Sequence, residues 1–523
     1  MQFYSLAFVL FMVVALVAYY GIGRLFGKGQ WVVLLAASLA FYAFCGWQNF
    51  VFVGVTSVST WIGALAFAHF DGQSKEARSQ AESRDEKKAI KRRFVRKKRL
   101  VLLAMLVLNF GILSYIKYAD VLVRYVMPDT TWTAGILLPL GISFYTFQSI
   151  SYVVDTYNGK YAPERNFAKY LLFISFFPQV IQGPINRFDA LAEQLYATRS
   201  FDVRNARRAL LQIGYGALKK YVIADIVVWV VDGIFDNVSP GIPGSAVVVG
   251  ILLYAIYQYA DFSGGIDMVL GFARLFGVQM ADNFRQPYFS VSLADFWRRW
   301  HITLGAWMRD YVFYPFALLP AVQRWGKWLT RRCGKHIGRT LPACVANILV
   351  FFLVGLWHGA ESHFILWGLY NGLVIAASDL LTPLWDKMNK ALHVNVEGKA
   401  HHVFCIVRTF IIVNIGWYFD RIVDPNALSI CFRNTVFNFH PELLMPALGR
   451  VVDSHLAMGL MLAAIGTVFV FIISVLKERG IDVAGAIVDW PAPARGLLYA
   501  VVVLMVASSF MFGMGSGFMY ANF

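Results

Sequence analysis

The chain has 523 residues, of which 58% are hydrophobic, and its formal net charge is +16. Its mean hydropathy is +0.56, and its apolar runs approach the thickness of a bilayer, which excludes a soluble globular fold. Segments of about ten residues with alternating hydrophobicity, the mark of a membrane β-barrel, are missing as well. The sequence therefore predicts an all-α polytopic membrane protein.

The predicted spanning helices start close to the N-terminus. Residues 3–20 lack a basic leading region and a small-residue cleavage site, so we interpret them as a retained helix and not as a signal peptide. Apolar segments, with edges good to about three residues, fall near 3–20, 31–46, 49–69, 100–116, 135–154, 221–235, 245–262, 343–358, 364–380, 404–419, 456–476 and 496–514. We expect 11–12 spanning helices, accompanied by re-entrant segments and amphipathic interfacial helices.

Positive charge is concentrated in one segment. Residues 87–99 read KKAIKRRFVRKKR, without an acidic residue. No nucleic-acid-binding module accompanies this run, so we expect no nucleic-acid partner. The positive-inside rule explains the run better and places the 71–99 loop in the cytoplasm, where anionic lipid headgroups attract it. The N-terminus and loops 236–244 and 420–455 then lie outside, and the basic loop 324–339 lies inside.

A segment near residues 170–186 departs from the pattern of spanning helices. Pro178 and Pro184 interrupt it, and basic residues flank it on both sides. We expect a re-entrant segment, because a broken backbone is tolerated at membrane depth only where protein or a water-filled cavity satisfies it. An ordinary kinked helix is the alternative.

The first candidate histidine, His301, lies in the stretch ADFWRRWHITLGAWMRDY. Ser292 and Asp295 fit a capping box, which predicts a helix from Leu293 onward. The apolar side chains that recur at spacings of three and four residues are Phe296, Trp300, Leu304, Trp307 and Tyr311. This pattern predicts one amphipathic helix at the cytoplasmic interface. His301 can be structural there, bonded to a backbone carbonyl, or functional.

The second candidate, His358, ends the apolar run VANILVFFLVGLWHGA. An ionisable residue at membrane depth is a functional-site hypothesis, and capping of the helix end is the structural alternative. Gly355 and Gly359 flank it and allow another backbone or a ligand to approach closely. Neutral imidazole can take a proton from a hydroxyl as that oxygen attacks an acyl carbon. Desolvation would keep the ring neutral, and indole N–H groups, a second histidine or backbone N–H groups could stabilise the oxyanion.

Other polar residues are interpreted as structural. Neither histidine belongs to an H-x-x-x-H or H-E-x-x-H pair or lies beside an acidic cluster, so we expect no metal. His363 is expected at the surface or at an interface, and Lys219 and Lys220 at the level of the headgroups. Asp261 and Asp267 are expected at a helix end or in a polar cavity. Five scattered cysteines without C-x-x-C spacing indicate neither disulfides nor zinc.

Six stretches together carry a family resemblance. They are LPLGISFYTFQSISYVVDTYNG (138–159), FISFFPQVIQGPINRF (173–188), GALKKYVIAD (216–225), YADFSGGIDMVLGF (259–272), NFRQPYFSVSLADFWRRWHITLGAWMRDYVFYP (283–315) and VGLWHGAESHFILWGLYNG (354–372). They resemble the membrane-bound O-acyltransferase family in its bacterial branch, which serves alginate O-acetylation and D-alanyl transfer to teichoic acid. The run DFWRRWHI followed much later by GLWHGA is the most specific part.

The resemblance implies a helical bundle around a transmembrane tunnel, with His358 as the main catalytic residue and His301 at a second position that holds histidine or asparagine among relatives. The acyl donor would enter from the cytoplasm and the acceptor from outside. His358 lies about 15 residues, or ~22 Å, from the inner end of its segment, which is beyond mid-depth of a ~30 Å hydrocarbon core. The residues expected to line the tunnel or contact the donor are Trp297, Trp300, Trp357, Asp261, Ser263 and Gln182.

The family also implies substrates and partners. No bound cofactor is expected; acetyl-CoA or an acyl carrier protein thioester would be the acyl-donor substrate. An acyl carrier protein on the cytoplasmic side and an extracytoplasmic acyltransferase or polysaccharide-modification protein are the expected partners, in addition to the lipid bilayer. We expect a multi-pass protein of the inner (cytoplasmic) membrane. It divides into N-terminal transmembrane helices (1–134), a catalytic core (135–400) and C-terminal transmembrane helices (401–523).

Departures from the family pattern weaken the assignment of alginate as the acceptor polymer. Relatives often read DFSGYSD where residues 261–267 read DFSGGID, and FYPFALLPAVQRWGKW replaces the Gly-Gly-Asn-Arg run of alginate-type members. The ending GFMYANF resembles the aromatic ends of some bacterial members. We expect transfer of an acyl group, acetyl before others, to an extracytoplasmic polysaccharide. D-alanyl transfer to teichoic acid is the close alternative, and a transporter without acyl chemistry is a distant one, because paired inverted segments are not evident.

Overall fold

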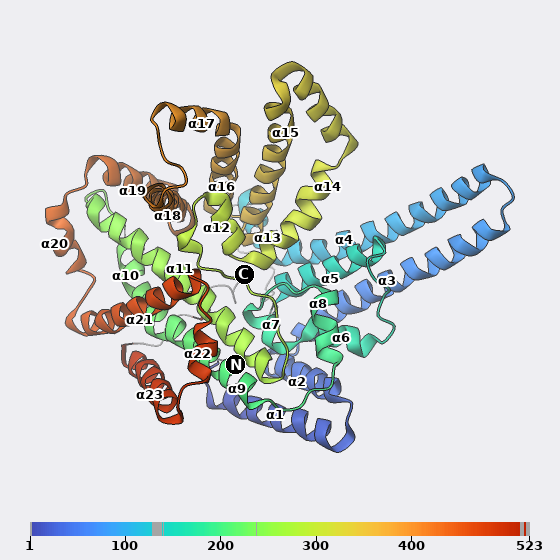
Figure 1. Ribbon diagram of the computed structural model, residues 1–523, viewed down its shortest axis with the longest axis horizontal. Helices are drawn as coiled ribbons and strands as arrows, with labels where there is room; N and C mark the ends of the chain where they lie inside the picture. Colours follow the sequence, from blue (N-terminus) through green and yellow to red (C-terminus); the bar gives the residue numbers. More distant parts are fainter. Residues whose placement is uncertain (1–2, 128–138, 140, 237, 513–516, 519–523) are drawn as a thin grey trace. The chain divides into compact units, whose positions relative to one another are not determined.

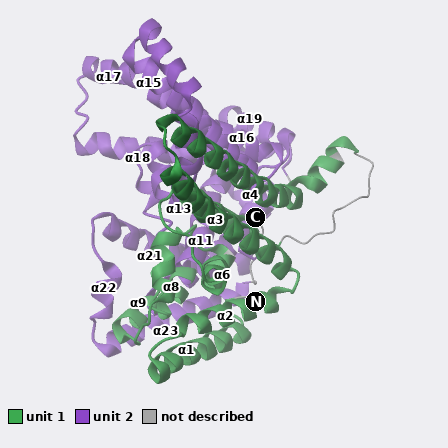
Figure 2. Ribbon diagram, turned by 90° about the vertical axis from the view of Figure 1, so that its right-hand side faces the viewer, with its two compact units in different colours: residues 1–209, 269–281, 521–523 green, residues 210–268, 282–520 purple. Residues whose placement is uncertain are grey.

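The computed structural model describes residues 3–127, 139, 141–236, 238–512 and 517–518, and these are almost entirely helical (Figure 1). The chain forms two compact units (Figure 2). Unit 1 contains residues 1–209, 269–281 and 521–523, and unit 2 contains residues 210–268 and 282–520. The all-helical fold predicted from the sequence is confirmed, whereas the three-part domain division remains a prediction.

Within the described residues, eight helices are long and apolar enough to cross a membrane. They are α1 (Leu6–Phe26), α3 (Asn49–Gln80), α4 (Arg84–Val126), α11 (Gly244–Leu275), α15 (Pro320–His358), α18 (Lys399–Arg421), α21 (Ser454–Glu478) and α23 (Ala492–Ser509). Helices α16 (Ser362–Leu380) and α17 (Thr382–Ala391), bent by 56°, make a ninth if they count as one span. These numbers confirm a multi-pass membrane protein.

Among the described residues, fewer helices are long and apolar enough to span than the 11–12 expected, in part because some apolar segments form short helices. Helices α2 (Gln30–Cys45) and α5 (Ile142–Tyr157) have 16 residues each. The segment 221–235 lies in η1 (Leu218–Ala224) and α10 (Asp225–Phe235), which continue α9 (Val203–Ala217) without a gap. A helix needs about 20 residues to cross the hydrocarbon core. The predicted span 135–154 begins outside the described residues and is helical from Ile142 onward.

In unit 1, the basic segment is helical and forms part of a long hairpin of α3 and α4 (Figure 1). Only residues 81–83 separate the two helices, and the Ser83 side chain caps α4 by accepting from the Glu86 N–H at 3.0 Å. The 71–99 segment is therefore helical except at residues 81–83, and its basic part is the first half of α4. Lys98 ties the hairpin together through Asp71 at 2.7 Å and the Tyr157 carbonyl at 3.2 Å.

The interrupted segment of unit 1 forms two short helices, α6 (Phe167–Ser175) and α7 (Phe177–Gln182). The backbone breaks at Phe176, and Pro178 occupies the first turn of α7. The carbonyl of Phe173 next to the break accepts from the side-chain amides of Gln148 at 3.1 Å and Gln179 at 2.7 Å. A buried broken backbone is thus satisfied by side chains, as membrane depth requires. Neither helix is long enough to cross a bilayer, which agrees with the expected interruption.

In unit 2, α15 and α16 pack backbone against backbone. A Cβ atom at Gly355 would collide with the Phe364 carbonyl oxygen, and one at Gly368 would collide with the Phe351 carbonyl oxygen. Only glycine permits such an approach. The expectation that Gly355 admits a neighbouring backbone is therefore confirmed, and the contact holds the end of α15, with His358, against the start of α16.

The remaining helices are short or connect the longer ones. They are α8 (Phe188–Tyr196), α9 (Val203–Ala217), the π-helices η1 (Leu218–Ala224) and η3 (Arg309–Phe313), α12 (Leu293–Arg299), α13 (Ile302–Met308), α14 (Tyr314–Ala317), α19 (Pro425–Phe437), α20 (Leu444–Leu448), α22 (Val483–Val488) and the 3-10 helices η2 (Pro287–Phe289), η4 (Pro441–Leu443) and η5 (Phe510–Phe512). Both candidate histidines lie in unit 2.

Candidate active site

The predicted amphipathic helix around His301 is broken in two, which corrects the sequence-based expectation. Helix α12 starts at Leu293 as predicted, and Ser292 caps it by accepting from the Asp295 N–H at 3.1 Å. The helix ends at Arg299, and α13 begins at Ile302. Between them, His301 adopts φ 46° and ψ 51°, the left-handed conformation that costs a non-glycine residue on the order of 1–3 kcal/mol.

The extended segment 283–285 pairs with residues 299–302 and stabilises this break. The Ile302 N–H donates to the Asn283 carbonyl at 3.0 Å, and the Arg285 N–H donates to the Arg299 carbonyl at 2.9 Å. Phe284 and Trp300 form an antiparallel bridge between these two bonds. Tertiary hydrogen bonds therefore replace the helical bonds that the apolar periodicity predicts across residues 300–301.

The side chain of Asn283 defines the proton position on His301. Its Oδ1 atom accepts from the Thr303 N–H at 3.0 Å and from the Thr303 hydroxyl at 2.9 Å, and it lies 3.3 Å from His301 Nδ1. A backbone N–H can only donate, so the Asn283 atom that faces it is the oxygen. Nδ1 of His301 must then carry the proton, which leaves the lone pair of the neutral ring on Nε2.

Burial keeps this imidazole neutral. His301 is 3% exposed and lies outside the candidate spans, and desolvation lowers its pKa from 6.5 to about 3. The edge of Phe262 packs against the ring, with centroids 4.8 Å apart and planes at 82°. His301 is thus a neutral acceptor in an aromatic environment at physiological pH.

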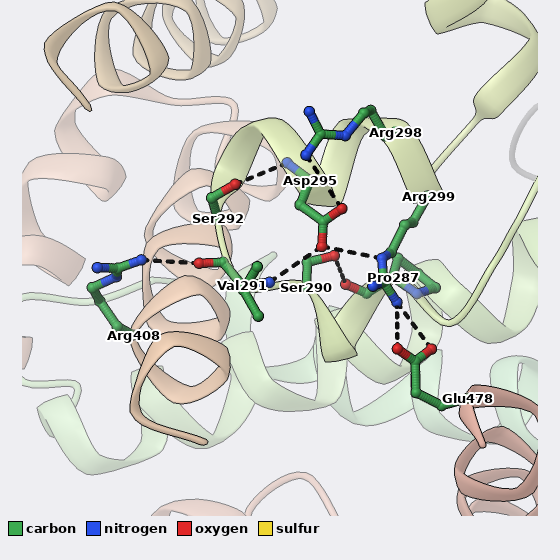
Figure 3. A network of polar contacts seen from close by, with 9 residues as sticks. All are labelled: Pro287, Ser290, Val291, Ser292, Asp295, Arg298, Arg299, Arg408 and Glu478. Carbon is green, nitrogen blue, oxygen red and sulfur yellow. Dashed lines mark hydrogen bonds and ion pairs between the residues drawn. The ribbon is translucent and has the colours of Figure 1, made fainter. Parts of the chain in front are cut away.

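Polar contacts fix α12 just before His301 (Figure 3). The Asp295 carboxylate accepts from the Val291 N–H at 3.3 Å and pairs with Arg299 Nε at 3.1 Å. Arg299 also donates to both carboxylate oxygens of Glu478 on α21, at 2.8 and 2.9 Å. The Arg408 side chain on α18 donates to the Val291 carbonyl at 2.9 Å. Helix α12 is therefore tied to two of the candidate spans.

His358 is the last residue of α15 and is 8% exposed. Its ring lies 5.7 Å from that of Phe364 in a stacked arrangement and meets the Trp367 ring at 5.1 Å and 74°. The Trp357 ring is 4.8 Å from His358 and 6.1 Å from His301. The two histidines, 57 residues apart in the sequence, thus contact the same indole.

Two more tryptophans from the sequence analysis join this cluster. Trp297 packs against Trp367 at 5.4 Å, and its indole N–H donates to Asn371 Oδ1 at 3.1 Å. Trp300 is 2% exposed and packs against Phe284 and Phe296. The structure therefore brings together His301, His358, Trp297, Trp300 and Trp357. Among the described residues, no group of three His, Cys, Asp or Glu side chains is placed to hold a metal ion.

The remaining predicted site residues have other surroundings. Asp261 and Ser263 lie on α11 beside Phe262 and are engaged by lysines, with Lys220 Nζ 2.5 Å from Asp261 and Lys219 Nζ 2.7 Å from Ser263. Gln182 is fully buried at the end of α7 in unit 1, whereas both histidines belong to unit 2.

Two sequence-based interpretations are wrong. Lys219 and Lys220 are not exposed headgroup anchors, since they are only 1% and 2% exposed and form ion pairs with Asp267 and Asp261. His363 is 5% exposed at the start of α16, so it is not a surface residue. Of the two settings expected for Asp261 and Asp267, the helix end is excluded, because both lie inside α11.

Sequence reasoning missed Asn283, Phe262 and Trp367 as neighbours of the histidines. Asn283 and Phe262 stand in two of the stretches that carry the family resemblance, but nothing local to either one signals a contact with a residue 18 or 39 positions away. A polar side chain next to a break in the helix is the kind of signal that only the fold makes visible.

Comparison with known proteins gives this arrangement its family. The profile of the membrane-bound O-acyltransferase family matches residues 164–407, which include both histidines. The probable alginate O-acetylase of Pseudomonas aeruginosa is 32% identical over 423 residues, which are 79% of this chain and 70% of that protein. The peptidoglycan O-acetyltransferase of Helicobacter pylori is 28% identical over 77% of this chain and 75% of its own length. The teichoic acid D-alanyltransferase of Bacillus subtilis is 28% identical over 53% of this chain and 67% of its own length. The protein is therefore a member of the membrane-bound O-acyltransferase family and an acyltransferase.

Proposed function

We propose that this acyltransferase moves an acetyl group from a cytoplasmic thioester across the membrane toward hydroxyl groups of an extracytoplasmic polysaccharide, with His358 as the general base. The observation that carries the proposal is the aromatic cluster in which His301 and His358 contact the same Trp357 ring. Two imidazoles in apolar surroundings suit proton removal from an alcohol, because a general base must be neutral before it acts.

The reaction balances with the groups of the chain and the two substrates. His358 takes the proton of the acceptor hydroxyl as its oxygen forms a bond to the thioester carbon. The tetrahedral intermediate collapses, the C–S bond breaks, and the thiolate leaves with the proton that the imidazolium returns. General-base action of this kind contributes about 10²- to 10⁴-fold to the rate.

His301 has a different part in this proposal. In the tautomer that Asn283 defines, its Nε2 accepts and does not donate. It can therefore orient a hydroxyl or receive a proton, but it cannot stabilise an oxyanion through Nε2. Indole N–H groups are the stronger candidates for that task, and Trp357 is the indole next to both rings.

The relatives favour acetyl as the acyl group. The probable alginate O-acetylases match at higher identity than the D-alanyltransferases do, 31–35% against 25–28%, and most of them match over longer stretches. The departures in residues 261–267 and 313–328 argue against alginate itself as the acceptor. We propose that acetyl-CoA or an acyl carrier protein supplies the thioester, that the protein resides in the cytoplasmic membrane, and that an extracytoplasmic acyltransferase completes the transfer.

Mass spectrometry of cell-surface glycans tests the proposal. Cells that carry the wild-type protein should show O-acetyl groups that disappear in the deletion strain and in His358→Ala, while the membrane level of the variant stays unchanged. Glycans that carry D-alanyl esters would identify the alternative acyl group. Full acylation by His358→Ala at wild-type protein level would refute the role of this residue as the general base.

A further inference from the structure

Two adjacent buried lysines of unit 2 bond to the same helix that contacts His301. Lys219 Nζ lies 2.6 Å from Asp267 Oδ2 and 2.7 Å from Ser263 Oγ. Lys220 Nζ lies 2.5 Å from Asp261 Oδ1 and 2.7 Å from Asp225 Oδ1. Three of these four partners, Asp261, Ser263 and Asp267, belong to α11.

Two of the lysine partners on α11, Asp261 and Ser263, flank Phe262, the residue that packs against His301. Phe262 stands between Asp261 and Ser263 in the sequence, and its ring meets the imidazole of His301 at 4.8 Å. Successive residues of a helix point about 100° apart. Bonds that fix the directions of Asp261 and Ser263 therefore also fix the direction in which Phe262 points.

Close backbone contact between α9 and α11 restricts the movement of α11 further. A Cβ atom at Gly216 would lie 2.5 Å from the Gly264 carbonyl oxygen, and one at Gly264 would lie 2.8 Å from the Gly216 carbonyl oxygen. Gly216 lies near the end of α9, and the two lysines lie in the π-helix η1 that follows it. The wider turn of a π-helix is frequent at functional sites. Lys220 also donates to the Gly517 carbonyl at 3.3 Å.

We propose that Lys219 and Lys220 are positioning residues for His301: their bonds to Asp261, Ser263 and Asp267 fix the rotation of α11 and thereby the ring of Phe262 that holds the imidazole. The proposal rests on the proposed part of His301 in acyl transfer. A rotation of α11 by 10° would move a ring about 6 Å from the helix axis by about 1 Å. A displacement of that size can lower the rate of a positioned reaction by about 10²-fold.

A role in stability alone accounts less well for the network. Buried ion pairs are weak stabilisers, and replacing both partners by apolar residues of similar volume is often neutral, whereas removing one partner leaves a buried charge. The double variant Lys219→Met/Asp267→Leu therefore separates the two roles, because it removes both charges. Lys98→Met/Asp71→Leu removes the partly buried pair of the α3–α4 hairpin in unit 1 and serves as the matched control.

The experiment follows the ring of His301 and the transfer reaction separately, in the full-length protein in lipid nanodiscs. Histidine labelled with ¹³C at Cε1 gives the His301 resonance, assigned by its loss in His301→Asn. In Lys219→Met/Asp267→Leu, this resonance should shift and its titration midpoint should move upward, and kcat for acetyl-CoA should fall about 10- to 100-fold with KM changed less than about threefold. The control variant should match wild type in both measurements.

Two outcomes have distinct meanings. An unchanged His301 resonance and an unchanged kcat in the folded double variant would overturn the positioning role of Lys219. A shifted resonance together with full transfer would confirm that Lys219 and Asp267 position His301. The same result would refute the part of His301 in the proposed reaction.

Discussion

Asn283 Oδ1 lies 3.3 Å from Nδ1 of His301 while it accepts two bonds from Thr303, so one amide fixes both the tautomer and the orientation of the imidazole. A ring oriented through one nitrogen presents the other to a substrate, which is how polar neighbours tune catalytic histidines.

Replacing Asn283 by aspartate should change the charge of His301 without removing the acceptor oxygen. A carboxylate next to the ring favours the imidazolium, so the pKa of His301 should rise from about 3. Histidine NMR in nanodiscs measures this shift directly. Asn283→Leu, of similar volume, removes the acceptor and should lower acetyl transfer by about 10- to 100-fold. Equal transfer by Asn283→Leu and wild type at equal protein level would show that the tautomer does not matter.

Acid should destabilise the protein through His301. Its pKa is about 6.5 in the unfolded chain and about 3 in the folded protein. Between these values the unfolded chain binds a proton that the folded protein excludes, so stability is lost as the pH falls below 6.5. The loss is about 1.4 kcal/mol per pH unit, or roughly 2 kcal/mol at pH 5. Thermal unfolding at pH 7.5 and pH 5 should show this component in wild type.

The control for the acid effect is His301→Asn. Asparagine tolerates the left-handed conformation of this position better than other non-glycine residues, so the backbone keeps its geometry. It does not titrate, and the variant should therefore lose less stability than wild type between pH 7.5 and pH 5. An identical acid response in both proteins would assign the effect to other groups.

Close packing of α15 on α16 predicts a strong effect of one added methyl group. Gly355→Ala places a Cβ atom against the Phe364 carbonyl, so the helices must separate near His358. Overpacking of this kind costs about 1–3 kcal/mol, and acetyl transfer should fall with it. Gly54→Ala in α3 is the matched control, since a Cβ there meets nothing within 4 Å. Melting temperature and glycan acetylation of the two variants test the difference.

Only part of the structure around His301 can be predicted from the sequence. The start of α12 is predictable, because Ser292 and Asp295 form a local cap. The break at His301 is not, because Phe296, Trp300 and Leu304 keep helical spacing through it, and the bonds that replace the helix come from Asn283. Lys219 and Lys220 were misread for a related reason. Adjacent lysines beside an apolar segment are typical of headgroup anchors, and their partners on α11 lie more than 40 residues away.

The orientation of α15 decides from which side each substrate reaches His358, and native cysteines allow a direct test. Cys333 is exposed, whereas the other four cysteines are buried or partly buried. The positive-inside rule places it in the cytoplasm. A membrane-impermeant maleimide should therefore label Cys333 in inverted vesicles but not in intact spheroplasts, and Cys333→Ser should abolish the signal.

The other end of α15 should show the opposite behaviour. Helix α15 is interrupted at Gly334, where φ is 89°, and the 24 residues that follow, up to His358, span about 36 Å, more than the ~30 Å hydrocarbon core. Glu361, three residues beyond His358, is exposed. In a Cys333→Ser background, Glu361→Cys should react with the maleimide in intact spheroplasts. Labelling of both positions from one side would mean that α15 does not cross the membrane, and the acceptor could then not reach His358 from outside along this helix.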